Sequence, residues 1–198
     1  MENTNNRFRR RSSIKIAIGV FGFAAMLALI CGNGCANTSV TLLSNKDVAA
    51  VRPVKRLYVL IEQGALEKQP VSKKLDEQLK SDVLAASLRN CLSNTSVKLE
   101  ISVVDPLALD EKIYETKIWE FYADAVLIIK IKNVVMDQFG GSPIIYYDAG
   151  LFDEITHKYV WRAVINNSGN PGAMDQRMQK MADAIVAQLR ADGFIESR

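Results

Sequence analysis

Between residues 56 and 103 the pattern of apolar residues changes from that of a strand to that of a helix and back to that of a strand. This order limits the chain to folds that combine helices with a sheet. Residues 56–62, RLYVLIE, form a short β-rich run typical of a buried strand. Strict alternation in SVKLEISVV, residues 96–104, predicts a half-buried strand. Between them lies one stripe of an amphipathic helix, made by Leu75, Leu79, Val83, Leu84, Leu88, Cys91 and Leu92. A right-handed crossover through this helix makes the two strands parallel.

The rest of the chain predicts a short helix, a meander of three strands and a long helix. The short helix covers residues 108–122, with these side chains packing inward: Ile113, Ile118, Trp119 and Tyr122. The strands cover residues 123–135, 142–153 and 158–165, with a hairpin turn at 154–157 and a loop, NNSGNPG, at 166–172. The last helix has an apolar face of Met174, Met178, Met181, Ile185 and Leu189 and ends at Gly193.

This order predicts an α/β (α+β) fold with a single mixed twisted sheet of about five strands. Two long helices and one short helix pack on the sheet in residues 55–198, which form one domain. Three stretches, YADAVLIIKIKNV, YYDAGLFDEITHKYVWRAVI and LRADGFI, resemble small bacterial periplasmic lipoproteins, many of them uncharacterised. Their domain is similar to the amino-terminal domain of TolB and to CsgG-type lipoproteins. The resemblance implies a role in envelope assembly, transport or secretion through binding other proteins, and it transfers no catalytic residue.

The amino terminus has the three parts of a secretory signal. A basic patch that contains Arg9, Arg10 and Arg11 precedes an apolar run over residues 16–31, and the small residues Gly32 and Gly34 follow. We therefore expect residues 1–34 to be a cleaved signal peptide, although the run also leaves an uncleaved anchor open.

Cys35 is the expected lipidation site. It follows Gly34 and precedes Ala36, a context that resembles the lipobox of bacterial lipoproteins. Cys31 follows the bulkier Ile30 and is the weaker candidate, and cleavage by signal peptidase I without lipidation is the alternative. The resemblance also implies that the non-acidic residues after Cys35 suit the outer membrane, facing the periplasm. Residues 35–54 would then form a lipidated tether with one short edge strand at 40–43.

The basic charge of the chain is concentrated in the signal segment. Five of the 25 basic residues and one of the 22 acidic residues precede Cys35, which leaves 20 positive and 21 negative charges after it. The part that follows is therefore nearly neutral, and we expect no nucleic-acid partner. Cys91 is the one thiol beyond Cys35, so a disulfide framework is not expected, and its place in the helical stripe predicts a small buried apolar side chain.

Residues 36–198 contain none of the familiar arrangements for catalysis, a metal or a cofactor. His157 is the only histidine and falls in the predicted turn, where a solvated role is expected. Asp148 and Asp153 are five residues apart on one strand, so they point to opposite faces and do not form a carboxylate pair. Asp153 is expected to open the turn by binding backbone amides. We therefore predict no enzyme, no cofactor and no metal site.

Tyr146, Tyr147, Trp161 and Arg162 are the candidate partner-contact residues, because Tyr, Trp and Arg supply much of the energy at interfaces. Trp161 is expected to pack in the core, with Arg162 pointing to the other face.

The chain is thus predicted to be a lipid-anchored cell-envelope protein, a binding or accessory component of an assembly, transport or secretion complex. Its expected partners are the membrane, through the lipid, and envelope proteins. An oligomeric structural subunit of a secretion apparatus and a small-ligand-binding protein are the alternatives.

Overall fold

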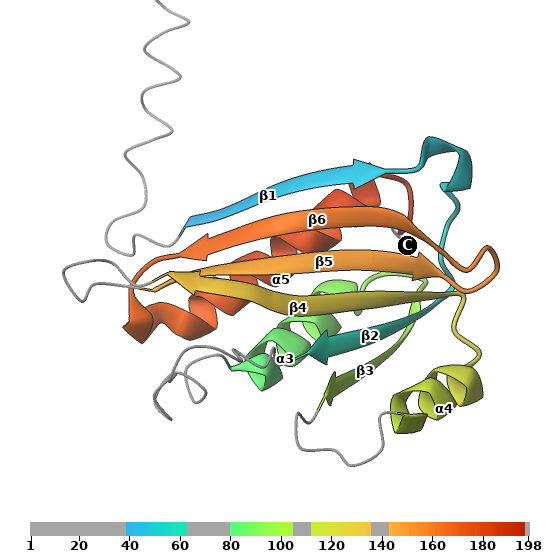
Figure 1. Cartoon of the computed structure of the whole chain (residues 1–198), viewed down its shortest axis with the longest axis horizontal. Helices are drawn as coiled ribbons and strands as arrows, with labels where there is room; N and C mark the ends of the chain where they lie inside the picture. The colour runs from blue at the N-terminus through green and yellow to red at the C-terminus, as the bar shows by residue number, and fades with distance from the viewer. Residues whose placement is uncertain (1–38, 63–79, 105–111, 136–142, 197–198) are drawn as a thin grey trace, which may run out of the picture. The chain divides into compact units, whose positions relative to one another are not determined.

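The computed structural model contains an open mixed sheet of six strands in the order β1-β6-β5-β4-β2-β3 (Figure 1). The structure describes residues 39–62, 80–104, 112–135 and 143–196, all within the unit Asn37–Arg198. The predicted α+β class is confirmed, with six strands instead of about five. The described elements are β1 (Ser39–Lys46), η1 (Val48–Ala50), β2 (Arg56–Glu62), α3 (Ser81–Leu92), β3 (Lys98–Val104), α4 (Lys112–Phe121), β4 (Ala125–Val135), β5 (Ile144–Asp153), β6 (Lys158–Ser168), η2 (Pro171–Ala173) and α5 (Met174–Ala191).

The strand directions agree with the predicted connections. β2 pairs in parallel with both β3 and β4, as the crossover through a helix requires. β4, β5 and β6 form an antiparallel meander, with register shifts in the β4–β5 and β5–β6 pairs. The sheet therefore changes from parallel to antiparallel pairing at β4.

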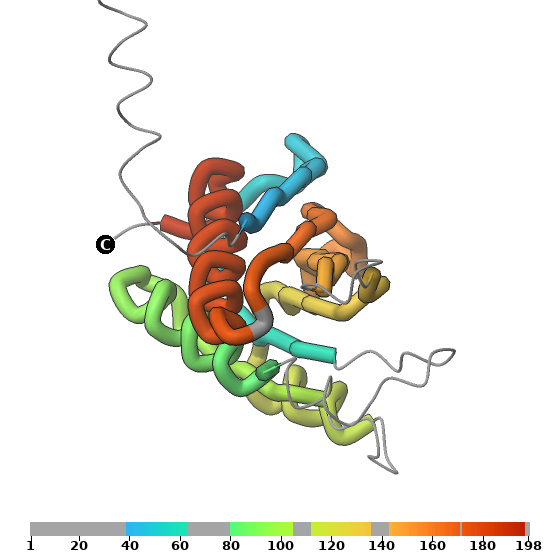
Figure 2. Tube along the Cα trace, turned by 90° about the vertical axis from the view of Figure 1, so that its left-hand side faces the viewer, coloured from blue at the N-terminus to red at the C-terminus, as the bar shows by residue number. Residues whose placement is uncertain are grey.

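Most of the apolar core lies between one face of the sheet and two long helices. Figure 2 shows α3 and α5 side by side on this face. The predicted apolar face of α5 is confirmed, since all five side chains are 2% exposed or less: Met174, Met178, Met181, Ile185 and Leu189. Gly193 ends α5 as predicted, with a φ of 88° that favours glycine, and its N–H donates to the carbonyl of Arg190. The part of the predicted first helix before Lys80 lies outside the described residues.

β1 is longer than the short edge strand that the sequence predicts. It pairs with β6 along all eight residues without a register shift, from Ser39 opposite Ser168 to Lys46 opposite Trp161. Val40 and Leu42 pack against the core through the alternation of the strand. Residues 39–54 are therefore part of the fold, although the sequence predicted a tether over 35–54. The signal segment 1–34 and Cys35 lie outside the described residues.

α4 packs on the opposite face of the sheet from α3 and α5, but with fewer side chains than predicted. Tyr114, Ile118 and Phe121, spaced by four and three residues, pack against Tyr58 and its neighbours. The prediction that Ile113, Trp119 and Tyr122 also pack inward was wrong. Their side chains are 46%, 70% and 61% exposed, because they lie off this stripe.

β6 continues through residues 166–168, where the sequence predicted a loop. Asn167 pairs with Val40 of β1 and Ile145 of β5, and it is fully buried. Its side-chain carbonyl accepts a hydrogen bond from Nε of Arg177 at 2.9 Å. A contact from α5 therefore allows an asparagine to occupy a buried strand position.

Candidate functional site

The four predicted partner-contact residues lie on both faces of the sheet. Tyr147 and Trp161 are 3% and 1% exposed and belong to the core, so partner contact stays a prediction only for Tyr146 and Arg162. Tyr146 is half-buried, and Arg162 is exposed with its guanidinium 4.3 Å from the centre of the Tyr159 ring. The predicted burial of Trp161 is confirmed.

Trp161 anchors the carboxyl end of α5 to the sheet. Its indole N–H donates to Asp192 at 2.9 Å, and Gln188 and Lys46 donate to the same carboxylate at 3.0 and 3.1 Å. Burial alone would raise the pKa of Asp192, but these three donors outweigh it and hold the pKa below its usual value. The polar atom of the buried indole is thereby satisfied, and Trp161 has a structural role.

Cys91 is half-buried between α3 and α5. Its Sγ lies 3.0 Å from the Asp183 carboxylate, to which it donates, and 3.5 Å from Nε2 of Gln179. Burial and the neighbouring carboxylate raise the pKa of the thiol to about 11. The thiol is therefore protonated at neutral pH and is a poor nucleophile.

The predicted role of Asp153 in the hairpin turn is confirmed. Its carboxylate accepts hydrogen bonds from the backbone N–H groups of Ile155 and Thr156 at 2.8 and 3.4 Å. Asp153 is buried, whereas Asp148 is partly exposed and lies 3.6 Å from Nζ of Lys132, so the two carboxylates do not form a pair. His157 lies in the turn with an exposed side chain, as predicted.

Two arginine–aspartate pairs lie at the end of the sheet where β2 and β4 begin and β5 ends. Arg52 donates to both carboxylate oxygens of Asp153, at 2.7 and 3.3 Å. Arg56 donates to Asp124 at 3.2 Å from its side chain and at 2.8 Å from its backbone, and the Lys55 N–H adds a bond of 3.1 Å. The Asp124 carbonyl accepts from the Glu154 N–H at 3.2 Å. These contacts connect three loops that are far apart in the sequence.

A cleft of about 230 Å³ opens among these loops and is lined in part by Arg52, Lys55, Asp124 and Asp153. Burial alone would raise the pKa of both carboxyl groups, but the hydrogen bonds from the two arginines and from backbone N–H groups lower both below their usual values. Both carboxylates are therefore ionised at neutral pH and already paired. In this state neither carboxylate can act as a general acid.

Exposed aromatic side chains border this end of the sheet. Trp119 and Tyr122 are 70% and 61% exposed, with ring centres 6.0 Å apart, and the Arg56 guanidinium lies 5.9 Å from the Tyr122 ring. Tyr122 has a left-handed φ of 53°, and its N–H donates to the Trp119 carbonyl at 2.9 Å. Ile155, in the β5–β6 turn, is 67% exposed.

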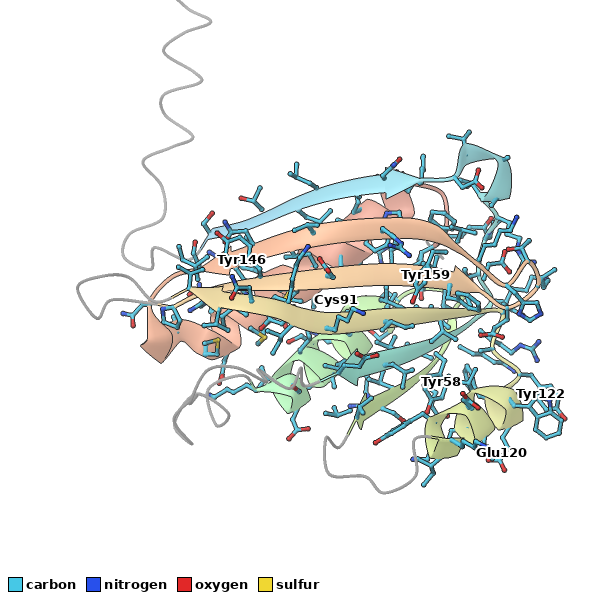
Figure 3. All side chains as sticks on the ribbon, viewed as in Figure 1. Tyr58, Cys91, Glu120, Tyr122, Tyr146 and Tyr159 are labelled. Atoms are coloured by element: carbon cyan, nitrogen blue, oxygen red, sulfur yellow. The ribbon has the colours of Figure 1, made fainter. Side chains whose placement is uncertain are left out.

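We call the surface formed by Trp119, Tyr122, Arg56, Ile155 and the cleft the aromatic end. Figure 3 shows Tyr122 at this end and Tyr146 at the other end of the sheet. Sequence reasoning missed the aromatic end because it placed Trp119 and Tyr122 in the core. The spacing of Tyr114, Ile118 and Phe121 was the available signal, since a helix this short on a sheet buries one narrow stripe.

The described residues contain no group of three or more His, Cys, Asp or Glu side chains suited to hold a metal ion. In the same part of the chain, every helix is too short or too polar to cross a bilayer.

No protein-family model matches the chain, and no curated protein matches its sequence. Solved structures with a similar arrangement of elements include the PelC dodecamer from Paraburkholderia phytofirmans. That match is 14% identical, covers 80% of this chain and 100% of the PelC chain, and has a TM-score of 0.48. A DUF330 protein from Xanthomonas campestris is 12% identical, with coverages of 73% and 89% and a TM-score of 0.40. Lipoprotein GNA1162 from Neisseria meningitidis is 15% identical, with coverages of 69% and 99% and a TM-score of 0.38.

These TM-scores are all below 0.5, so the three structures assign no function to this chain. None of the three is a TolB or CsgG protein, and the resemblance to those two groups stays a prediction.

Proposed function

We propose that this chain is a lipid-anchored protein of the cell envelope that recruits a protein partner through its aromatic end and is not an enzyme. Acylated Cys35 would hold it at a membrane, at the periplasmic face of the outer membrane, once residues 1–34 are removed. The order of basic, apolar and small residues before Cys35 supports the anchor. Holding the domain at a surface raises the local concentration of whatever it binds.

The exposure of Trp119 and Tyr122 is the observation that carries the binding role. Large aromatic side chains at the surface of a folded unit contribute strongly to interfaces when a partner removes them from water. The Tyr122 ring is already placed by its contact with Arg56, and Asp124 fixes that arginine in turn. Less side-chain freedom is therefore lost on binding than for a mobile surface ring.

The direction of β1 supports this arrangement. Ser39 is four residues after Cys35, a span of at most about 14 Å of extended chain. β1 then runs along β6 to Lys46, which pairs with Trp161 in the first half of β6, and Asp153 ends β5 at the same side of the sheet. An anchor at Cys35 would therefore restrain the Ser39 end of the sheet, while the aromatic end lies about 25 Å further along the strand. That end would be accessible to a partner in the periplasm.

Metabolic labelling tests the anchor. Cells fed an alkyne fatty acid should produce labelled protein, and Cys35→Ala should abolish the label, whereas the matched variant Cys31→Ala should keep it. Label that persists in Cys35→Ala and disappears in Cys31→Ala would assign the lipid to Cys31. A product that carries no label and retains residues 1–34 would contradict the anchor altogether.

Site-specific crosslinking tests the binding surface. A photoreactive amino acid at position 119 should capture an envelope protein in intact cells, and the same amino acid at position 146, at the other end of the sheet, should capture less. Stronger capture at 146 would move the partner surface to the end of the sheet at Tyr146, one of the four residues that the sequence singled out. Equal and weak capture at both positions would contradict recruitment through either surface.

The two alternatives differ in what they require of the structure. A small-ligand protein needs a pocket, and the cleft of about 230 Å³ is below the roughly 300–1,000 Å³ usual for small-molecule sites. An oligomeric structural subunit needs a surface that pairs with a second copy of the chain, and the β1 edge of the sheet offers such a surface.

A further inference from the structure

β1 forms one edge of the sheet, and one of its two backbone edges is unpaired in the described part of the chain. The strand pairs with β6 on its inner side only, and the order of the sheet places no strand beyond it (Figure 1). The pairing covers eight residues without a bulge, so the outer N–H and C=O groups form a regular row. Such a row is a template on which another strand can pair.

The two edges of the sheet differ in the charges that usually protect an edge. β3, at the other edge, has the exposed charged residues Lys98 and Glu100. β1, with the sequence SVTLLSNK, has only one charged residue, Lys46. The ammonium group of Lys46 lies at the carboxyl end of α5, 3.1 Å from an Asp192 carboxylate oxygen. β1 therefore lacks the free charges and bulges with which proteins prevent pairing between edges.

Leu43 is the most exposed apolar side chain of this edge. It is 73% exposed, and it points away from the core that Val40 and Leu42 contact. A large aliphatic side chain in the middle of an unprotected edge strand gains most when a second strand covers it.

We propose that two copies of this chain pair through β1, antiparallel and about a two-fold axis at Leu43. The two Leu43 side chains then lie opposite each other, and Thr41 lies opposite Asn45 of the second copy. Lys46 lies opposite Val40 of the second copy, so no like charges meet. Two six-stranded sheets join into one continuous sheet of twelve strands. The contact is isologous and leaves only the charged β3 edges free, so assembly stops at the dimer.

The pairing itself depends only on β1. The proposed lipid anchor would favour this pairing, because anchoring both copies at one membrane raises their local concentration. The two ideas can fail separately, since acylation is measured at Cys35 and pairing at Leu43.

Disulfide trapping tests the register in the full chain with Cys91→Ser as background. Residues directly opposite in an antiparallel pair have Cα atoms about 4.5–5.5 Å apart, within the roughly 4.4–6.8 Å that a disulfide spans. Leu43→Cys should therefore give a covalent dimer on a non-reducing gel of isolated envelopes. Asn45→Cys is the matched control, because this position is also exposed but would lie about 13 Å from its own copy. The Cys91→Ser background, which still contains Cys31 and Cys35, should stay monomeric, and a dimer in this background would report those two thiols and not Leu43.

Three outcomes would overturn the proposal. The first is a Leu43→Cys dimer no more abundant than that of Asn45→Cys. The second is native mass spectrometry of the detergent-extracted full chain that finds a monomer, or an assembly larger than a dimer. The third concerns a charge at Leu43. Leu43→Lys places two like charges on the axis and should convert the dimer to a monomer with an unchanged circular dichroism spectrum and unchanged acyl labelling. A Leu43→Lys protein that stays dimeric would place the dimer contact elsewhere.

Discussion

At the end of the sheet where β1 begins, Arg177 is fully buried, and its acceptors within the described residues are all neutral oxygens. At the aromatic end, Arg52 and Arg56 are partly exposed and each pairs with an aspartate. The acceptors of Arg177 are the Asn167 side chain, at 2.9 Å, and the backbone carbonyls of Pro143, Asn167 and Gly169. They connect α5 to the start of β5 and the end of β6. One guanidinium thus fixes three elements.

The difference follows from the access of water to each end. Burial lowers the pKa of Arg177, and a buried charge is tolerable only when its donors are satisfied by protein groups. Arg52 and Arg56 retain 43% and 42% side-chain exposure, so water can replace part of each contact. The Arg177 end is therefore expected to stabilise the fold. The aromatic end can accept a partner at little cost in the free energy of unfolding.

The largest effect is expected for Arg177→Met, which keeps an unbranched side chain but removes every donor. Its four acceptor oxygens would be left without this donor, and a buried unpaired polar group costs roughly 1–3 kcal/mol. The free energy of unfolding should fall by more than about 3 kcal/mol, measured by urea denaturation of the full chain. Arg52→Met at the aromatic end is the control and should lose less than half as much. Equal losses would remove the distinction between the two ends.

A smaller loss is expected for Asp153→Asn. The amide can still accept from the turn, but the charge-assisted bonds from Arg52 become weaker. We expect the free energy of unfolding to fall by about 1–2 kcal/mol, since Arg52 is partly exposed and screened. Asp148→Asn on the same strand should change it by less than about 0.5 kcal/mol, because the contact with Lys132 is exposed. An Asp148 variant as costly as the Asp153 variant would contradict this account of the turn.

Acid should separate the two ends further. The folded pKa values of Asp124 and Asp153 are lower than their usual values, so the unfolded chain binds protons first as the pH falls. Their contribution to stability is present above the unfolded pKa of about 3.9 and is lost as the pH falls through the lower folded values. Among the described residues, the groups that Arg177 contacts include no carboxylate. Hydrogen exchange between pH 5 and 3 should therefore show the amides of Lys55 and Arg56 losing protection before the amide of Asn167, and the reverse order would contradict the assignment.

The sequence predicted those parts of the fold whose periodicity extends over many residues. The β4–β6 meander and the apolar face of α5 are long enough for the alternation or the helical stripe to be unambiguous. β1 was predicted too short because Ser44, Asn45 and Lys46 are polar, and their strand conformation depends on pairing with β6. The face of α4 was misassigned because a helix of ten residues holds too few apolar positions to define one stripe.

The candidate site was harder to predict, since its contacts join residues that are distant in the chain. Arg52 and Asp153 are separated by 101 positions, and nothing in the local sequence indicates that they pair. Arg177 is different, because it follows Met174 by three residues and precedes Met181 by four, on the buried stripe of α5. A cation on such a stripe was a visible sign of a buried polar contact.

The smallest effect on stability is expected for Trp119→Ala, and it gives the sharpest test of what the aromatic end is for. The indole is 70% exposed, so its loss should change the free energy of unfolding by no more than about 0.5 kcal/mol. Capture of an envelope partner should nevertheless decrease, measured by pull-down from crosslinked envelopes, while Tyr146→Ala serves as the matched control at the other end. A Trp119→Ala protein that loses as much stability as Asp153→Asn would make the ring a structural element. One that keeps both its stability and its partner would leave the exposed ring without a role in binding.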